Sequence, residues 1–159
     1  KKELKVCKIK DCIQQKSDIS EHTSKSCIFC KIIKGEIPCS KVYEDSNVFA
    51  FLDIGPVNQG HTLVIPKEHH KTIRDIPDSL LKDVIVVVKK ISSAVRSGVV
   101  CDGISINMSN GEEAGQVVPH AHFHIIPRVS GDGLKLWPQG TYKDGEMDKI
   151  KDKIVSSLY

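Results

Sequence analysis

Three histidines alternate along one short segment of the chain. The segment "PHAHFHIIPR" covers residues 119–128, and its histidines occupy every second position: His120, His122 and His124. On a β-strand, residues two apart share a face, so the three rings are expected to point to one side. The residues expected to point the other way, into a core, are Ala121, Phe123 and Ile125.

Three interpretations of this alternation are open. The first is a half-buried strand whose polar face happens to hold histidines, although lysine, glutamate or threonine would serve equally there. The second is a metal site, because imidazole is a good ligand for zinc. The third is nucleophilic catalysis at phosphorus, since imidazole is neutral near pH 7 and can form a covalent intermediate. Neighbouring rings would then donate protons and stabilise charge.

A glycine-bearing loop precedes the histidines and favours the phosphorus chemistry. The stretch "SNGEEAGQVV" contains Gly111 and Gly115. Glycine lets the backbone approach a ligand closely, and turning peptide N–H groups can cradle a phosphate. Loops of this kind are common turns, so the signal depends on its position beside the histidines.

A second chemical signal is the pair Cys27-x-x-Cys30. The spacing is compatible with zinc binding or with redox chemistry. A redox centre would favour a βαβ context, which the sequence does not indicate, and zinc would need two further ligands. The chain has six cysteines and no secretory pattern, so a disulfide framework is not expected. Cys39 and Cys101 are expected to be small core residues.

The composition is that of an ordinary globular domain. The chain has 159 residues, of which 40% are hydrophobic and 27% charged, with a net charge of +3. That charge is too small to indicate a nucleic acid partner, although a phosphate-bearing small ligand would be compatible. No apolar run approaches the roughly 18 residues of a membrane span, so no membrane partner is expected. We expect a cytoplasmic protein, with the nucleus and an upstream targeting segment left open.

The elements that must position these residues are predicted from periodicity. Residues 1–26 are polar and lysine-rich and are expected to be a flexible extension, followed by one domain with a C-terminal tail over 27–159. A long helix is predicted over 77–98 and closed by a cap at Gly98. Its apolar stripe is Leu80, Val84, Val87, Ile91 and Val95, joined by Leu81 and Val88.

Shorter elements flank this helix. A short helix is expected from Cys27 to a stop at Gly35, and a short amphipathic helix near 146–157. Five strand-like runs are predicted, over 41–45, 48–54, 60–66, 103–109 and 121–126, the first two as a hairpin. Because hairpin links dominate, the predicted fold class is α+β with a mostly antiparallel sheet.

Several segments resemble the histidine triad (HIT) family. "HAHFHII" is similar to its His-x-His-x-His motif, and "CIFCKIIKGEIP", "KVYED", "FAFLDI", "GHTLVIPKEH", "NGEEAGQ" and "HIIPR" follow in family order. "LWPQG" is similar to the Trp-Pro segment of the Hint-like branch. The resemblance covers roughly residues 27–140. It implies a HIT-like fold: α+β, with a mostly antiparallel five-stranded sheet, one long helix and one short one.

The resemblance also implies an activity and catalytic residues. It implies a nucleotide hydrolase or nucleotidyl transferase that acts at the α-phosphate. His122 would attack phosphorus and form a nucleotidyl-histidine, which water would then hydrolyse to a nucleoside monophosphate. His124 would contact the phosphate and assist protonation of the leaving group. His61 would be a fourth active-site histidine.

Nucleotide-binding residues are implied in the same way, with two departures from the family pattern. The implied positions are Asp53, Asn110, Gly115, Gln116 and Val117. Asp53 would bind the ribose hydroxyls, unless it simply ends its strand in a turn. Many members carry serine or threonine where Val117 stands, and a valine side chain has no hydroxyl to donate. Many also have asparagine at Ser109, so either Ser109 or Asn110 could take that role.

For the cysteine pair, the resemblance favours zinc. In zinc-bearing relatives the other ligands are a histidine after "IP" and the first triad histidine, which correspond here to His69 and His120. The implied site is a closed structural Zn²⁺ site of Cys27, Cys30, His69 and His120. His70 is a competing ligand, and the alternative is a free thiol pair with His120 merely hydrogen-bonded.

The function expected from the sequence is a Hint-like hydrolase of purine nucleoside 5′-phosphoramidates or related nucleotidyl conjugates. One alternative is a Fhit-like dinucleoside polyphosphate hydrolase, against which "LWPQG" argues. The other is a nucleotide-binding regulatory module with low turnover, which Val117 keeps open. The resemblance also implies a homodimer, although the sequence alone does not show one.

Overall fold

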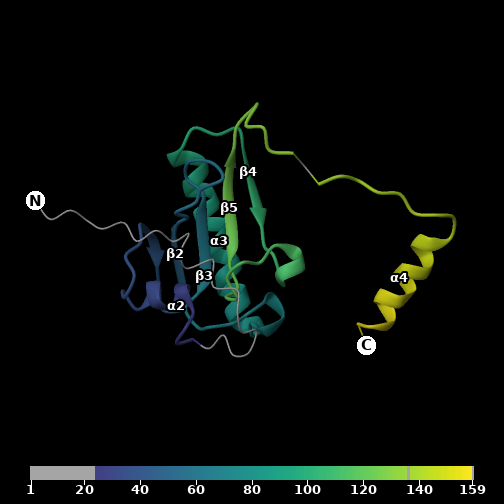
Figure 1. The fold of residues 1–159 in the computed structure, drawn as a ribbon, viewed down its shortest axis with the longest axis horizontal. Helices are drawn as coiled ribbons and strands as arrows, with labels where there is room; N and C mark the ends of the chain where they lie inside the picture. The colour runs from purple at the N-terminus through teal and green to yellow at the C-terminus, as the bar shows by residue number, and fades with distance from the viewer. Residues whose placement is uncertain (1–23, 136, 159) are drawn as a thin grey trace, which may run out of the picture.

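The computed structural model describes residues 24–135 and 137–158. Along the chain (Figure 1) the elements are α2 (Ile28–Ile33), β1 (Lys41–Glu44), β2 (Val48–Leu52), β3 (Thr62–Pro66), the 3₁₀ turn η1 (Ile73–Asp75), α3 (Asp78–Gly98), β4 (Gly103–Asn107), the 3₁₀ turn η2 (Glu112–Ala114), β5 (Phe123–Arg128) and α4 (Glu146–Ser156). The predicted N-terminal extension falls largely on residues 1–23, outside the described residues, so the boundary at residue 27 stays a prediction.

One antiparallel sheet of five strands, in the order β1-β2-β3-β5-β4, organises the molecule. The β1–β2 hairpin forms where predicted, because the carboxylate of Asp45 accepts hydrogen bonds from the N–H groups of Asn47 and Val48 and closes the turn. In the centre of the sheet His124 on β5 pairs with Leu63 on β3 and with Asn107 on β4. The predicted α+β class and antiparallel sheet are confirmed.

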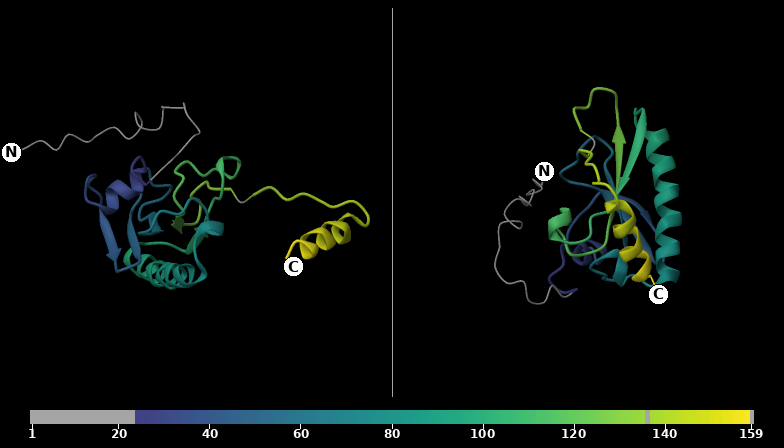
Figure 2. Two further views of the ribbon diagram at one scale, coloured as in Figure 1. Left: turned by 90° about the horizontal axis from the view of Figure 1, so that it is seen from below. Right: turned by 90° about the vertical axis from the view of Figure 1, so that its right-hand side faces the viewer.

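The two faces of the sheet are covered by different helices. Figure 2 shows α3 along one face and α2 over part of the other. The residues buried between α3 and the sheet are Val48, Ala50, Val64, Val84, Val87, Val88, Ile91, Val95, Phe123 and Ile125. Those buried on the α2 face are Cys27, Phe29, Cys30, Ile32, Phe49, Phe51, Leu63 and Ile65. The predicted stripe of the long helix is therefore its core-facing side.

The helix ends follow the sequence signals with one difference. After α2, Gly35 adopts a positive φ of 75°, which favours glycine and stops the helix. Gly98 is the last residue of α3 rather than its cap. The capping residue is Val99, whose backbone is extended and whose N–H bonds to the carbonyl of Val95. Gly98 therefore ends the helix at the expected place without a left-handed turn.

The histidine strand begins later than predicted. β5 starts at Phe123, so His120, Ala121 and His122 lie in the segment before it. The N–H of Ala121 bonds to the carbonyl of His70 and not to a strand, because β3 ends at Pro66 and its pairing with β5 stops at Val64 and Phe123. Only His124 of the three histidines belongs to the strand itself.

One predicted core cysteine is exposed. Cys101 is buried as expected, but Cys39 is exposed in the connection between α2 and β1. The prediction for Cys39 was wrong because free cysteine is usually buried, whereas this residue lies in a connecting segment that no element covers. No helix in the described ranges is long and apolar enough to cross a membrane.

Candidate functional site

The three histidines lie on the sheet face that α2 covers. The ring of Phe29 on α2 lies edge-on to the rings of His120 and His122, with centroid distances of 5.8 and 5.2 Å. The rings of His122 and His124 are 4.8 Å apart. His120 is fully buried, His122 is 5% exposed and His124 is half-buried. The row of rings thus runs from the core to the surface, and its members face different surroundings.

At the buried end, His120 faces Cys30 on α2 and Cys27, the residue that precedes this helix. Its Nδ1 atom lies 3.5 Å from Sγ of Cys27 and 3.6 Å from Sγ of Cys30. Its Nε2 atom is 2.9 Å from the carbonyl oxygen of Pro66. A carbonyl only accepts hydrogen bonds, so the proton of His120 sits on Nε2 and the lone pair of Nδ1 points at the sulfurs.

His69 completes this group. Its Nδ1 atom lies 3.3 Å from Sγ of Cys30, and one ligand atom from each of Cys27, Cys30, His69 and His120 lies within 4.8 Å of all the others. In a tetrahedral zinc site, usual bond lengths place sulfur and nitrogen ligands about 3.6 Å apart. The four atoms therefore have the separation and the chemistry of a metal site. His70 lies outside the group, with Nε2 3.5 Å from the carboxylate of Glu68.

Burial sets the protonation of the two central members of this group. It lowers the pKa of His120 to about 4, so the ring is neutral at pH 7 and its nitrogen can bind a cation. Burial, followed by the neighbouring Cys27, raises the pKa of the Cys30 thiol to about 11. A metal ion that binds here must therefore displace a thiol proton.

The next ring, His122, is oriented by its own backbone. Its Nδ1 atom lies 2.6 Å from the carbonyl oxygen of His120. The carbonyl can only accept, so Nδ1 carries the proton and Nε2 carries the lone pair. Burial lowers the pKa of His122, which keeps the ring neutral. The structure thus provides a neutral, fixed imidazole whose free nitrogen can act as a nucleophile.

The third ring, His124, belongs to a hydrogen-bonded chain that begins at a backbone N–H. The N–H of Val57 donates to Nδ1 of His61 at 3.3 Å, so the proton of His61 sits on Nε2. That Nε2 lies 2.9 Å from Nδ1 of His124 and donates to it. The proton of His124 is consequently on Nε2. This arrangement gives His124 the opposite polarity to His122: it offers an N–H where His122 offers a lone pair.

Burial also keeps these two rings neutral. It lowers the pKa of His124 to about 4, and the nearby His122 and His61 act in the same direction. Burial lowers the pKa of His61 as well, although the carboxylate of Asp53 opposes it. Oδ2 of Asp53 lies 3.5 Å from Nδ1 of His61, and Oδ1 accepts a hydrogen bond from the N–H of Gly55 at 2.9 Å. Asp53 thus both closes the turn after β2 and lies beside the histidines.

The loop before the histidines is held by its own side chains. Oε1 of Gln116 accepts from the N–H of Gly111 at 2.8 Å, and Nε2 of Gln116 donates to the carbonyls of Lys71 and Val118. The amide of Gln116 is therefore engaged within the protein, and a ligand would meet its backbone instead. Gly115 has a φ of 88° and forms the left-handed end of η2, a conformation that favours glycine.

Asn110 and Val117, two of the predicted nucleotide-binding residues, differ in their surroundings. Oδ1 of Asn110 accepts from the N–H of Ile73 at 2.8 Å and ties the loop to η1. The neighbouring Ser109 lies beside Gly115, with Oγ 3.9 Å from the place a Cβ would take there. Val117 is 69% exposed, so an apolar side chain occupies an open position in the same loop. Which of Ser109 and Asn110 would contact a ligand stays a prediction.

A groove of about 210 Å³ opens next to this site. It lies between the ends of β4 and β5 and the segment that follows them, and its polar and aromatic lining includes Ser105, Asn107, Arg128, Lys135 and Trp137. Asn107 is the strand partner of His124, so the groove adjoins the exposed end of the histidine row. Trp137 is 81% exposed. The site therefore has room for a ligand that extends beyond the histidines.

Sequence reasoning missed the groups that set the proton positions. They are the N–H of Val57 and the carbonyls of Pro66 and His120, together with the ring of Phe29. The position of a backbone group cannot be read from residue types. The one available signal was the proline that ends "LVIP" before His69 and His70, which could have pointed to the carbonyl of Pro66. Phe29 was visible only as an apolar residue of the short helix.

Comparison with known proteins identifies the family. A family model described as HIT domain matches residues 34–131. An uncharacterised HIT-like protein of Methanocaldococcus jannaschii is 48% identical over 80% of this chain and 98% of its own length. The adenosine 5′-monophosphoramidase of Candida albicans is 40% identical over 84% of this chain and 91% of its own.

Solved structures agree with these matches. A HIT family protein of Bacillus subtilis superposes with a TM-score of 0.79 at 44% identity, covering 84% of this chain and 97% of that one. A zinc-bound histidine triad protein of Mycobacterium smegmatis superposes with a TM-score of 0.67 at 35% identity, covering 85% and 99%. With its triad, its fold and these relatives, the chain belongs to the HIT domain family.

Proposed function

We propose that this protein hydrolyses nucleoside 5′-phosphoramidates, or related conjugates in which a leaving group is attached to the α-phosphate of a purine nucleotide. The observation that carries the proposal is the opposite polarity of the two neighbouring rings, with a free nitrogen on His122 and an N–H on His124. Related proteins named adenosine 5′-monophosphoramidase, from Candida albicans and other fungi, support the substrate class.

The first half of the proposed reaction uses both rings. Nε2 of His122 attacks the α-phosphorus, a nitrogen–phosphorus bond forms, and the bond from phosphorus to the leaving group breaks. The leaving amine takes the proton from Nε2 of His124. The negative charge that this leaves on His124 is balanced by the positive charge that the neighbouring His122 ring gains when it bonds to phosphorus. His61 remains bonded to Nδ1 of His124 and holds the ring in place during this transfer.

The second half releases the product. A water molecule attacks the same phosphorus, the bond to His122 breaks, and the water proton passes to Nε2 of His124. The product is a nucleoside monophosphate, and both histidines regain their starting protonation. Asp53, Gly115 and the backbone of Gln116 are proposed nucleotide contacts, with the carboxylate of Asp53 on the ribose hydroxyls. Either Ser109 or Asn110 would complete the loop.

The decisive variant is His122→Ala. Removal of the nucleophile should lower kcat/KM for adenosine 5′-phosphoramidate by at least about 10³-fold. Circular dichroism should be unchanged, and mass spectrometry of wild type quenched in alkali, where the nitrogen–phosphorus bond survives, should detect the nucleotidyl adduct, whereas the variant should show none. Turnover retained by His122→Ala would overturn the proposal.

A regulatory module with little turnover remains the second candidate, and Val117 favours it. This open side chain stands in the ligand-facing loop and can donate no hydrogen bond. Under this alternative the protein binds AMP tightly yet hydrolyses neither the phosphoramidate nor a dinucleoside polyphosphate. Calorimetry with AMP and rate measurements on both substrates separate the candidates, and faster hydrolysis of the polyphosphate would favour the Fhit-like activity.

The proposed metal is structural Zn²⁺, held by Cys27, Cys30, His69 and His120. Two thiols and two imidazoles are donors that zinc prefers, and the zinc-bound relative of Mycobacterium smegmatis supports the choice. When bound, the ion would cross-link α2 to the segment before β5 and so support the position of His122 without contacting the substrate.

The protein is also proposed to be a homodimer that pairs through β4. The two edges of the sheet differ: β1 carries Lys41 and Glu44 and contains an irregularity in its pairing, whereas β4 is uncharged. Charges and irregularities protect an edge strand from pairing, so β4 is the edge open to a second copy. Ile106 on β4 is 48% exposed. The reduced thiols of the proposed metal site suit a cytoplasmic protein.

A further inference from the structure

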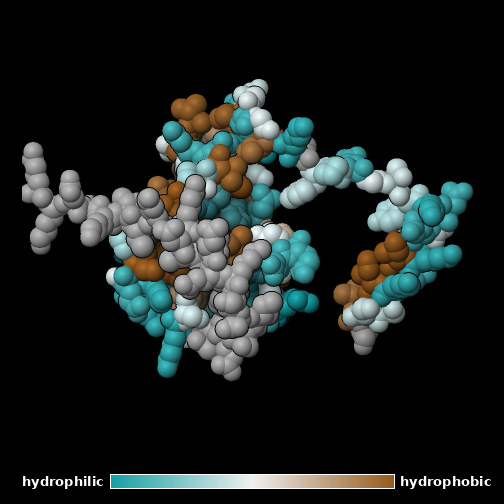
Figure 3. All heavy atoms as spheres, viewed as in Figure 1, coloured by the Kyte–Doolittle hydropathy of each residue, from teal (hydrophilic) through white to brown (hydrophobic). Residues whose placement is uncertain are grey.

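Helix α4 is amphipathic, and its apolar side is uncovered. No residue of α4 is buried. The apolar residues Met147, Ile150 and Ile154 follow helical spacing and are between 36% and 61% exposed, and Leu158, just beyond the end of the helix, is 69% exposed. Figure 1 shows the helix at the end of a long arm, well apart from the sheet, and Figure 3 shows its apolar side turned back toward the rest of the molecule. A stripe of this kind needs a partner.

The base of the arm, directly after β5, is held by a group of hydrogen bonds. The carboxylate of Asp132 accepts from Nε and Nη2 of Arg128 at 2.6 and 2.9 Å and from Nδ2 of Asn58 at 3.1 Å. It also accepts from the N–H of Leu134, while Nη2 of Arg128 donates to the carbonyl of Leu134. These bonds fix the turn after β5, from which the chain leaves past the β4 edge (Figure 1).

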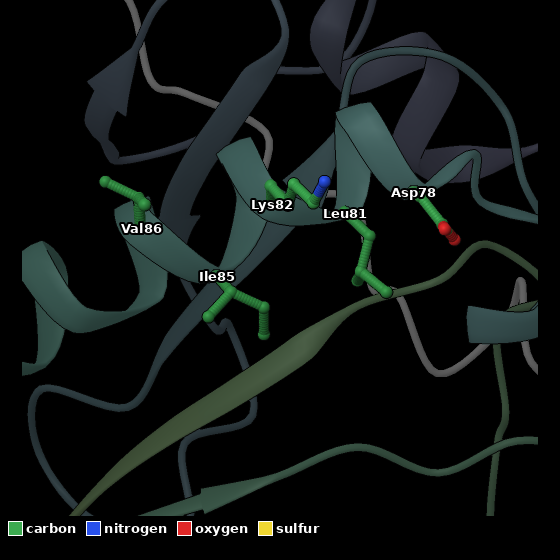
Figure 4. Close-up of a pocket in the computed structure, with 5 residues that line it drawn as sticks. All are labelled: Asp78, Leu81, Lys82, Ile85 and Val86. Carbon is green, nitrogen blue, oxygen red and sulfur yellow. The ribbon is translucent and has the colours of Figure 1, made fainter.

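The outer side of α3 offers a matching surface. A shallow depression of about 460 Å³, shown in Figure 4, is lined by Asp78, Leu81, Lys82, Ile85 and Val86. Ile85 is 46% and Val86 66% exposed. Lys90, which lies about 140° around the helix from Ile85, has its Nζ 4.4 Å above the ring of Tyr43 on β1. The depression is therefore on the side of α3 away from β1.

The position of α4 indicates which copy of the chain fills this depression. The helix stands beyond β4 with its apolar side facing the sheet, and the left view of Figure 2 shows it apart from α3 of its own chain. A second copy seated on the β4 edge would lie on the side that this apolar stripe faces. The argument rests on the homodimer that is part of the proposed function.

We propose that α4 of one protomer docks into the α3 depression of a second copy, so that the two arms are exchanged across the dimer. Charge favours an antiparallel arrangement. α4 carries Glu146 and Asp148 in its first turn and Lys153 in its last, while α3 begins at Asp78 and carries Lys89 further along. In the antiparallel orientation each helix start meets the opposite charge of its partner.

Disulfide trapping tests the exchange directly. In a Cys7→Ser, Cys12→Ser and Cys39→Ser background, one tagged chain carries Val86→Cys on α3 and an untagged chain carries Met147→Cys on α4, since the antiparallel arrangement places Met147 opposite Val86. After mixing and mild oxidation, the two chains should form a cross-linked species on a non-reducing gel. The control pairs Met147→Cys with Val100→Cys, a residue that is 97% exposed beyond the end of α3, and should stay uncross-linked. Cross-linking no stronger than the control overturns the proposal.

A single chain with both cysteines separates exchange from docking within one chain. Exchange predicts a covalent dimer, whereas a fast-migrating monomer with an internal disulfide would overturn the proposal. A variant that ends at Gly145 should raise the dimer dissociation constant at least about tenfold, measured by analytical ultracentrifugation. Hydrolysis of adenosine 5′-phosphoramidate is measured on the same samples, so that the two proposals can fail separately. An active dimer without cross-links overturns only the docking of α4. An inactive dimer that does cross-link overturns only the proposed hydrolysis.

Discussion

Nε2 of His61 lies 2.9 Å from Nδ1 of His124, and the two strands beside these rings, β3 and β5, pair with each other in the sheet. His61 directly precedes β3, and His124 lies within β5. Because the N–H of Val57 fixes the proton of His61 on Nε2, the proton of His124 must lie on its outer nitrogen. A residue that would not touch phosphorus thus decides which atom of His124 can give up a proton.

Replacing His61 by phenylalanine removes this control while keeping a ring of similar shape. His124 could then hold its proton on either nitrogen, so we expect kcat for a phosphoramidate to fall about 10- to 100-fold with little change in KM. His61→Asn, whose amide can donate to Nδ1 of His124, should recover part of the loss. Equal activity of His61→Phe and wild type in steady-state kinetics would contradict the role.

The free energy of unfolding should depend on pH through the same histidines. Burial lowers the pKa of His124 to about 4, whereas an unfolded histidine titrates near 6.5. As the pH falls below about 6.5 the unfolded state binds the proton first, so stability decreases until about pH 4; above 6.5 the contribution is fully present. For one histidine the slope is at most about 1.4 kcal/mol per pH unit.

Urea unfolding at pH 7.5, 6.0 and 5.0 measures this slope. His124→Asn removes one titrating group, so the variant should lose stability less steeply than wild type between pH 6.5 and 5. Both proteins keep the proposed zinc ligands and are loaded with zinc in the same way, so proton competition at the metal affects them equally. Identical slopes would show that His124 does not titrate abnormally.

Removing a proposed zinc ligand should affect metal content and stability together. Cys30→Ser and His69→Ala should each reduce zinc from about one ion per chain to well below one, measured by elemental analysis of protein not exposed to chelator. Loss of about 3 kcal/mol would lower Tm by about 10 °C. His70→Ala is the matched control and should keep its zinc, because His70 lies outside the cluster. Loss of zinc from His70→Ala would instead make His70, and not His69, the ligand.

The edge of the sheet supplies a test of the dimer. Ile106→Lys places a charge on β4 and should shift the protein toward monomers in light-scattering measurements, raising the dissociation constant about 100-fold. Val42→Lys on β1 is the control, since Val42 is 44% exposed and also lies on an edge strand. If Val42→Lys dissociates the dimer and Ile106→Lys does not, the pairing uses β1.

The fold was largely predictable because its signals are local. Helical spacing placed the buried stripe of α3, and turn residues such as Asp45 placed the first hairpin. The start of β5 was not predictable, because alternation continues through His120 and His122 while the hydrogen-bonding partner, β3, has already ended. The exposure of Cys39 was missed for a related reason: burial depends on which element covers a connecting segment, and residue type does not record it.

The candidate site, like the fold, was predictable in its residue types but not in what the folded backbone determines. The residue types in the triad and the cysteine pair indicated chemistry, and the fold brings them together over separations of about 90 residues. Their protonation depends on backbone groups, the N–H of Val57 and the carbonyls of Pro66 and His120. Every residue carries such groups, so their direction emerges only when the chain has folded.

The last prediction concerns the hydroxyl that Val117 lacks. Gln116 is tied into the loop by three hydrogen bonds, while the side chain of Val117 beside it is 69% exposed. Val117→Ser places a donor in this open position without disturbing a packed residue, and one added hydrogen bond to a phosphate or leaving-group atom should raise kcat/KM about tenfold. Val117→Ala, which shortens the side chain without a hydroxyl, should stay near wild type. If kcat/KM rises as much in the alanine variant as in the serine variant, the valine limits turnover by its bulk. If kcat/KM rises in neither variant while AMP still binds tightly, the protein acts by binding the nucleotide.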